Sequence, residues 1–326
     1  MKQRNFTYID THQGVRLRAV VEGHGPLVVL VHGWPESWYA YRHQIDALVQ
    51  AGMRVAALDM RGCGGSDKPE AQAAYTLRAL STDVAAVIDA LGGAPAVLVG
   101  HAEGAAIAWA TAILYRSKVR AVVGMSEPHR GCPPHPLNDL YSALWPERFF
   151  HAAYFQKPGV AERELDADIA RTLRKTFYGA SGADELLERA FASYRPKRSG
   201  FLDGLLDPPT LPAWLSEGDL AYCVEQLRAA GGFGSSLQHF RNSERDFRDL
   251  AELSDAVVQQ PALFIVGERD PVLDIMPGLR SGPCLERFYA DLRGKVFVPG
   301  VGRWLQQEAP TAVNHALLGF LAGLTL

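Results

Sequence analysis

Short apolar runs alternate with amphipathic stretches over the first 126 residues of the chain. Six segments have the pattern of β-strands: residues 5–11, 15–22, 27–32, 54–59, 96–100 and 119–126. Two of them, 27–32 and 54–59, are apolar enough for burial on both faces. Three stretches with helical spacing lie between the later ones, at residues 38–50, 76–91 and 104–115. This alternation predicts an α/β protein whose mostly parallel sheet is flanked by helices.

The pattern changes after residue 126. Several prolines follow, and residues 128–253 are helical, aromatic and charged, without the apolar run of a buried strand. Strand patterns return at residues 262–266 and 295–299, and residues 311–324 close the chain as an amphipathic helix. We therefore expect a core domain of residues 1–127 and 254–326, with an inserted helical cap domain of residues 128–253. Ligands of open α/β folds bind at the carboxyl ends of the strands, where such a cap would lie.

Composition narrows the class of function. The chain has 326 residues, a formal net charge of -3 and no run of Lys or Arg, so nucleic acid is not an expected partner. There is no apolar stretch of about 18 residues and no apolar leader segment, which favours a cytoplasmic protein without a membrane partner. The four cysteines show no metal-ligand spacing, so neither a metal nor another cofactor is expected. The expected partner is a small, largely apolar ligand, and the sequence leaves open whether the chain forms a homodimer.

Five segments, in order along the chain, carry a resemblance to a known family. Residues 31–38 read Val-His-Gly-Trp-Pro-Glu-Ser-Trp, and residues 59–66 read Asp-Met-Arg-Gly-Cys-Gly-Gly-Ser. The other three are the start of the expected cap (154–162), an acidic segment (266–272) and a C-terminal loop (300–314). Together they resemble the epoxide hydrolase branch of the α/β-hydrolase fold. The resemblance implies that fold, with a helical cap over the active site.

The resemblance also implies a mechanism. In that family an aspartate on a strand–turn–helix elbow attacks the epoxide carbon and forms an ester, while two cap tyrosines donate hydrogen bonds to the opening oxygen. A histidine, oriented by an acid, then activates the water that hydrolyses the ester.

Four of these positions differ here. The elbow reads Gly-His-Ala-Glu-Gly, which places Ala102 at the nucleophile position, and Arg303 stands at the position of the histidine. His151 and Phe240 match the two cap tyrosines. A methyl group cannot attack, and a guanidinium is a poor base. Only the acid, Asp270, remains of the expected set.

The remaining polar groups suggest other chemistry. The backbone N–H groups of Glu103 and Trp34 are expected to form an oxyanion hole, and the Glu103 side chain could act as a general base. Alternatively, Glu103 only forms an ion pair with Arg303. Arg303 is expected to contact Asp270, Glu103 or both. His151 is the candidate acid–base group of the cap, unless it only bonds to a backbone group.

These considerations give a predicted site and three hypotheses for function. The predicted catalytic residues are Glu103, His151, Asp270 and Arg303, and the predicted pocket comprises Trp34, Pro35, Ala102, His151, Phe240 and Trp304. The sequence favours a non-hydrolytic, non-covalent acid–base enzyme, by analogy one of specialised metabolism, that acts on a medium-sized, largely apolar molecule. An inactive protein that binds a hydrophobic ligand or a partner is the alternative. A residual hydrolase that activates water directly is the third.

Overall fold

The computed structural model describes residues 4–131, 135–183, 195–250, 253, 255–280 and 285–325. Among them, eight strands form one sheet in the order β1-β2-β4-β3-β5-β6-β7-β8. The first two strand pairs are antiparallel and the remaining pairs are parallel. The strands are β1 (Phe6–Asp10), β2 (Arg16–Glu22), β3 (Leu27–Val31), β4 (Arg54–Leu58), β5 (Ala96–His101), β6 (Val119–Met125), β7 (Val258–Gly267) and β8 (Tyr289–Val298). The expected α/β-hydrolase fold class, with a mostly parallel sheet between helices, is confirmed.

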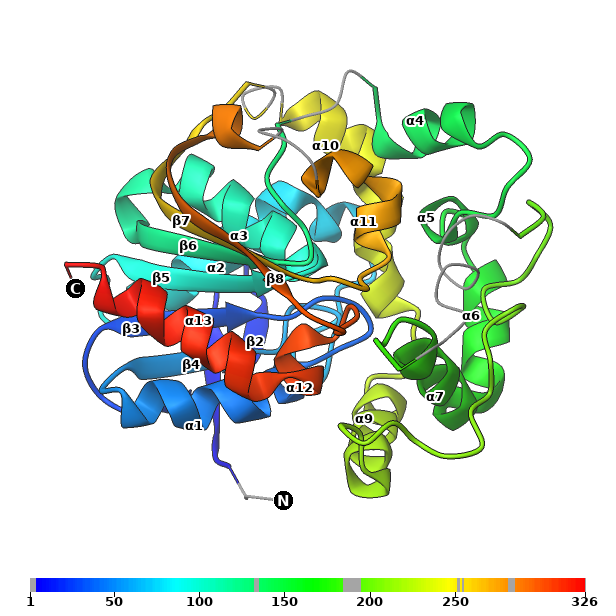
Figure 1. Ribbon diagram of the computed structural model, residues 1–326, viewed down its shortest axis with the longest axis horizontal. Helices are drawn as coiled ribbons and strands as arrows, with labels where there is room; N and C mark the ends of the chain where they lie inside the picture. The colour runs from blue at the N-terminus through cyan, green and yellow to red at the C-terminus, as the bar shows by residue number, and fades with distance from the viewer. Residues whose placement is uncertain are drawn as a thin grey trace.

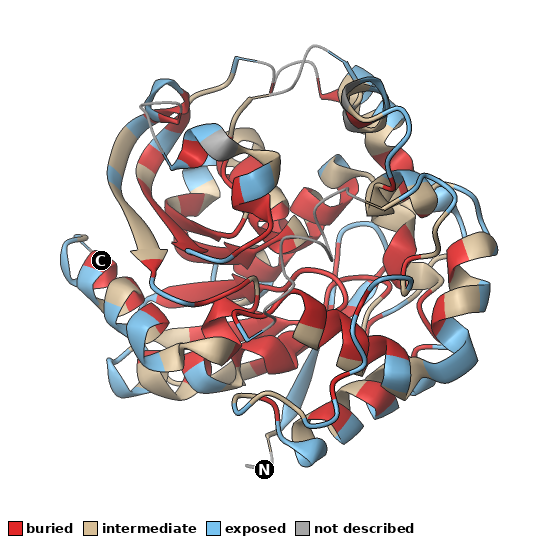
Figure 2. Ribbon diagram, turned by 45° about the vertical axis from the view of Figure 1, so that its right-hand side comes forward, coloured by how far each residue is buried: buried red, intermediate tan, exposed pale blue. Residues whose placement is uncertain are grey.

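Helices cover both faces of the sheet (Figure 1). One face packs on α2 (Leu77–Ala90) and α3 (Glu103–Leu114), and the other packs on α1 (Arg42–Gln50) and α13 (Pro310–Ala322). The central strand β3 is buried at every position, which explains its continuous apolar run. Buried residues fill the middle of the molecule, and exposed residues lie on its outer surfaces (Figure 2).

Between β6 and β7 the described residues are mainly helical, and this part of the chain lies beside the sheet (Figure 1). Its helices are α4 (Leu137–Leu144), α5 (His151–Tyr154), α6 (Val160–Leu165), α7 (Ile169–Gly179), α9 (Glu217–Ala229) and α10 (Ser243–Asp249). A hydrophobic cluster joins it to the core, because Trp34 and Trp304 of the core pack among its apolar side chains. The domain boundaries at residues 128 and 253 stay a prediction.

Several elements begin at other residues than the sequence pattern predicted. Both β7 and β8 begin several residues before the runs that the sequence indicated, at Val258 and Tyr289. Polar residues interrupt the apolar pattern at these ends, but pairing of the two strands extends through them. The predicted helix at residues 38–50 begins with a 3₁₀ turn, Trp38–Tyr41, before α1. None of the helices in the described ranges has the length and apolar composition needed to span a bilayer.

Candidate active site

A tight elbow joins β5 to α3 at the carboxyl edge of the sheet. Ala102 lies between the strand and the helix with φ of +52°, a conformation that side-chain-bearing residues rarely adopt. A methyl group on Gly100 or Gly104 would collide with backbone atoms of the opposite limb or of β3, so both positions require glycine. The elbow thereby places Ala102 and Glu103 at the edge where ligands of this fold class bind.

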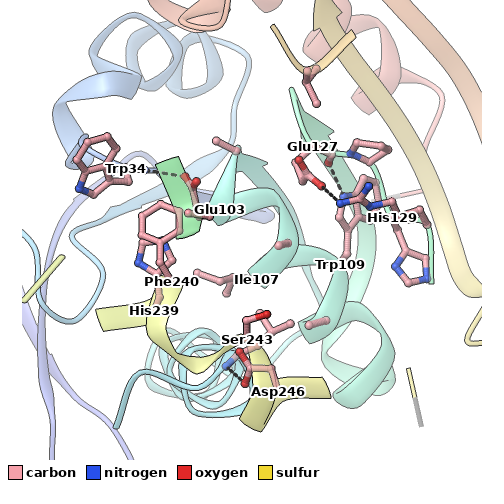
Figure 3. Close-up of a pocket in the computed structure, with 18 of the residues that line it drawn as sticks. Trp34, Glu103, Ile107, Trp109, Glu127, His129, His239, Phe240, Ser243 and Asp246 are labelled. Carbon is pink, nitrogen blue, oxygen red and sulfur yellow. Dashed lines mark hydrogen bonds and ion pairs between the residues drawn. The ribbon is translucent and has the colours of Figure 1, made fainter. Parts of the chain in front are cut away.

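The carboxylate of Glu103 turns back over the elbow. Its Oε2 accepts a hydrogen bond of 2.9 Å from the backbone N–H of Trp34, as Figure 3 shows. A methyl group on Gly33 would lie 2.7 Å from Cβ of Ala102 and 2.9 Å from this Oε2, so the carboxylate and the Ala102 side chain meet the same glycine. One of the two predicted oxyanion-hole donors, the backbone N–H of Trp34, therefore donates to the Glu103 side chain itself.

Glu103 is ionised at neutral pH. Burial alone would raise its pKa, but Arg303, His239 and the backbone N–H groups of Trp34 and Glu103 together lower it below the usual range. The side chain keeps 22% of its surface accessible, and it lines the cavity described below. An anionic oxygen is thus available to a ligand.

Arg303 lies between two carboxylates, as the sequence suggested. Its guanidinium nitrogens are 3.9 Å from Oε1 of Glu103 and 3.7 Å from Oδ1 of Asp270. Burial opposes its charge, but Asp270, Glu103 and Glu127 outweigh that effect and raise its pKa. These distances are longer than those of charge-assisted hydrogen bonds. Arg303 therefore stabilises negative charge in the site without a direct hydrogen bond to the Glu103 carboxylate.

The loop that carries Arg303 is fixed from both sides. Its backbone N–H donates to the carbonyl of Ala180 at 2.8 Å, and its carbonyl lies 2.8 Å from Nε2 of His101. Nδ1 of the same histidine lies 2.6 Å from a carboxylate oxygen of Glu36. His101 therefore connects the elbow strand to the Arg303 loop, which is a structural role.

A cavity of about 370 Å³ lies next to the elbow. Among the predicted site residues, six line it in addition to Glu103: Trp34, Ala102, His151, Phe240, Arg303 and Trp304. Pro35 is buried and does not line it. Asp270 is buried beneath Arg303, where its Oδ1 accepts the backbone N–H of Val272 at 2.9 Å.

The two matched cap positions face the cavity from the helical part of the chain. Burial and the charge of Arg303 lower the pKa of His151 to about 4, so its imidazole is neutral at physiological pH. The ring of Phe240 packs edge-on against both Trp34 and His151, with 6.1 Å between ring centroids in each pair. The imidazole of His151 and the ring of Phe240 are therefore both uncharged at neutral pH. The catalytic roles assigned to Glu103, His151, Asp270 and Arg303 stay predictions.

Sequence reasoning missed two carboxyl groups of the cavity wall, Glu127 and Asp246. Figure 3 shows Glu127 at the end of the cavity where Glu103 lies, and Asp246 at the opposite end. The available signal for Glu127 was its place two residues beyond the end of β6, at the edge where ligands bind. Within the described ranges, no three His, Cys, Asp or Glu side chains gather as metal ligands would.

Comparison with known proteins gives consistent results. The α/β hydrolase fold family model matches residues 26–281. Epoxide hydrolase A of Mycobacterium tuberculosis is 39% identical over 98% of this chain and 97% of its own length. Epoxide hydrolase B of the same organism is 35% identical over 96% of this chain and 97% of its own.

Solved structures agree with the sequence comparison. The crystal structure of epoxide hydrolase A from Mycobacterium thermoresistibile has a TM-score of 0.92 and 39% identity, over 99% of this chain and all of that chain. An epoxide hydrolase from an endophytic Streptomyces also has a TM-score of 0.92, with 37% identity over 99% of this chain and 96% of that chain.

These comparisons correct the functional expectation. The sequence favoured a non-hydrolytic enzyme, with an inactive binding protein as the alternative. Relatives that match nearly the whole chain at 35–39% identity are named epoxide hydrolases, so both interpretations are wrong. The expectation rested on the absence of a side-chain nucleophile at Ala102, and it ranked a hydrolase that uses Glu103 last, although the Glu103 carboxylate lies beside that position.

Proposed function

Because this chain belongs to the α/β-hydrolase fold family, in its epoxide hydrolase-like branch, we propose that it hydrolyses an epoxide on a medium-sized, largely apolar molecule. The relatives are named epoxide hydrolases, and this chain has a cavity of about 370 Å³ beside an ionised carboxylate. The proposed reaction adds water across the ring and releases a diol.

The proposal departs from the conventional mechanism at the nucleophile. Ala102 occupies the apex of the elbow and has no group that can attack, so the reaction starts at Glu103. The hydrogen bond from Trp34 holds Oε2, and Oε1 is the oxygen closer to Arg303. Oε1 attacks an epoxide carbon, the ring C–O bond breaks, and an ester forms between Glu103 and the substrate.

The lowered pKa of Glu103 supports direct attack over activation of water. A carboxylate of low pKa is a weak base, whereas an ionised carboxylate can still open a strained ring. Water then attacks the ester carbonyl, and the developing oxyanion lies on Oε2, where the N–H of Trp34 already donates. The hydrogen bond from Trp34 to Glu103 is the observation that carries the proposal.

The test compares the protein with its Glu103→Gln variant on a panel of aryl and alkyl epoxides in ¹⁸O-labelled water. We expect the unmodified protein to form labelled diols and to place label in the Glu103 carboxylate over repeated turnovers. The amide should reduce kcat at least about 10³-fold because it cannot form the ester. Glu268→Gln changes the same residue type at an exposed position and should leave the rate unchanged. Failure to hydrolyse any epoxide, or equal rates with Glu103→Gln, contradicts the proposal.

A further inference from the structure

Each of two neighbouring parallel strands, β5 and β6, is followed by a glutamate two residues after its last paired residue. His101 of β5 pairs with Met125 of β6, and the two glutamates, Glu103 and Glu127, each follow two residues later. Parallel strands lie about 4.8 Å apart, so the last paired residues are neighbours and both chains leave the sheet at the same edge. Both side chains line the same cavity, and Figure 3 shows them at the same end of it.

The position of Glu127 is fixed by its backbone, while its carboxyl group faces the cavity. Nε1 of Trp109 donates to the carbonyl of Glu127 at 2.9 Å, and the indole fits because Gly124 has no side chain beneath it. One carboxyl oxygen lies 3.5 Å from the guanidinium of Arg130, which also reaches the hydroxyl of Tyr141. The Glu127 side chain remains 26% exposed, so a ligand in the cavity can reach it.

We propose that Glu127 is the proton donor and then the base of the reaction that Glu103 begins. This inference rests on the proposed epoxide hydrolysis. In the first step Oε1 of Glu103 bonds to an epoxide carbon, the ring C–O bond breaks, and the ring oxygen takes the proton of the Glu127 carboxyl group. In the second step the Glu127 carboxylate removes a proton from water, and the resulting hydroxide attacks the ester carbonyl. The ester C–O bond at the Glu103 carbonyl carbon then breaks, so the tetrahedral intermediate expels the substrate alkoxide, which carries Oε1, and leaves a Glu103 carboxyl group. The alkoxide takes the proton of that carboxyl group and leaves as the diol, so Glu103 is again a carboxylate and Glu127 is again protonated.

The environments of the two carboxyl groups support this division of roles. Burial raises the pKa of Glu127, and the negative charges of Glu103 and Asp270 add to the effect, while Arg130 and Arg303 oppose it. The pKa of Glu103 is shifted in the opposite direction. Where two carboxyl groups of one site have pKa values moved apart, the higher one serves as acid and the lower one as the anion.

Other hydroxyl groups near the cavity are less suited to this role. The hydroxyl of Tyr75 donates to the carbonyl of Pro69 at 2.9 Å, so its proton is already engaged. The hydroxyl of Tyr141 lies 3.4 Å from Arg130 and is the competing donor. A tyrosine alone would not supply the base for the second step as readily as a carboxylate of raised pKa. A purely structural pair of Glu127 and Arg130 is the other alternative.

The experiment measures kcat and kcat/KM for para-nitrostyrene oxide between pH 5 and pH 9. It compares the unmodified protein with Glu127→Gln, Glu127→Asp, Tyr141→Phe and Asp166→Asn. Asp166 is a matched control, because it is also a carboxyl group of raised pKa, but it bonds to the backbone of Phe233 outside the cavity. Circular dichroism establishes that each variant is folded.

We expect Glu127→Gln to reduce kcat about 10²–10⁴-fold, to lose the alkaline limb of the pH profile, and to recover part of its rate with added formate. Glu127→Asp should retain the alkaline limb at a lower rate, which separates loss of the acid from misfolding. If the unmodified protein is active and Glu127→Gln keeps its rate and alkaline limb, or if Tyr141→Phe alone removes that limb, the role of Glu127 is wrong and epoxide hydrolysis stands. An unmodified protein that is inert on epoxides overturns the proposed function as well.

Discussion

At the scale of single residues, the proposed nucleophile is the side chain of Glu103, one residue after the elbow position that Ala102 occupies. The methyl group of Ala102 is small, and the carboxylate of Glu103 lies beside it, against Gly33. A larger residue at 102 would compete for that space, since even a methyl group on Gly33 would lie within 3 Å of both side chains. The reactive group in the proposed mechanism is therefore displaced by one residue along the chain, while the elbow backbone still presents it to the cavity.

Arg303 sets the charge state of this carboxylate. Replacing Arg303 by Gln removes the foremost group that counters the burial of Glu103, so the pKa of Glu103 should rise. Below its pKa the carboxyl group is protonated and cannot attack. The acidic limb of kcat/KM against pH should therefore move to higher pH. Steady-state rates with an aryl epoxide between pH 4 and pH 8 measure this shift.

The matched control is Arg293→Gln, which removes an arginine from an exposed ion pair with Asp291 on β8. It should leave the pH profile where it is. An acidic limb that stays in place in Arg303→Gln would mean that His239 and the backbone N–H groups keep Glu103 ionised without Arg303.

At the scale of elements, the sequence predicted most where burial is continuous. The strands of the first half were found within a residue or two, because residues such as Val28, Val29 and Leu30 are buried in an unbroken run. The extra length of β7 was not predictable, since Gln259 and Gln260 interrupt that pattern while the strand continues. Propensity and periodicity describe side chains, but strand pairing is made by the backbone.

The candidate site was predictable only where a motif marked it. Glu103 and Arg303 follow recognisable elbow and loop segments. Glu127 precedes Pro128, where the pattern suggested the start of an insertion, so its carboxyl group received no role. Its relation to Glu103 depends on the register of β5 against β6, which no local pattern in the sequence specifies.

One carboxyl group, besides Ala180 and His101, also holds the Arg303 loop in place. Glu308, at the end of α12 (Leu305–Glu308), accepts hydrogen bonds from the backbone N–H groups of Gly182, Gly302 and Trp304. Glu308→Ala leaves these buried donors without their partner, which should lower the free energy of unfolding by about 2–4 kcal/mol. Urea denaturation at pH 7 measures the change, and kcat should fall with it because Arg303 lies on this loop.

The control for this element is Glu286→Ala, which removes an exposed carboxylate that pairs with Lys295. Its effect on the free energy of unfolding should stay within about 1 kcal/mol. If Glu308→Ala is no more destabilising than this control, the loop is held by other contacts, such as the bond from Arg303 to Ala180.

At the scale of the whole molecule, the site is formed between two parts of the chain. The sheet edge supplies the elbow, Glu127 and the Arg303 loop, while the helical part supplies His151 and Phe240. An aromatic cluster around Trp34, with Phe155, Phe201 and Phe233, connects the two parts. The proposed function uses residues of both parts, whereas the sequence-based expectation judged each motif position separately.

A partly buried carboxyl group also connects the two parts, and it should make their association depend on pH. Asp246 of α10 accepts the backbone N–H of Leu77, the first residue of α2, at 2.8 Å. Burial raises its pKa to about 7 against the opposing effect of this hydrogen bond. The folded protein therefore favours the protonated form, and stability is lost as the pH rises from about 4, the value for an unfolded aspartate, to about 7.

Asp246→Asn removes the charge and keeps an oxygen that can accept the bond from Leu77. At pH 4, near the pKa of an unfolded aspartate, little of this stability has been lost, so the variant should differ little from the unmodified protein. At pH 8 the variant should be more stable by about 1–3 kcal/mol, a figure reduced for the partial exposure of the side chain. Urea denaturation at both pH values measures this difference, with Glu244→Gln, exposed on the same helix, as the control. Equal stabilisation at both pH values would show that the amide acts through packing rather than through the lost charge.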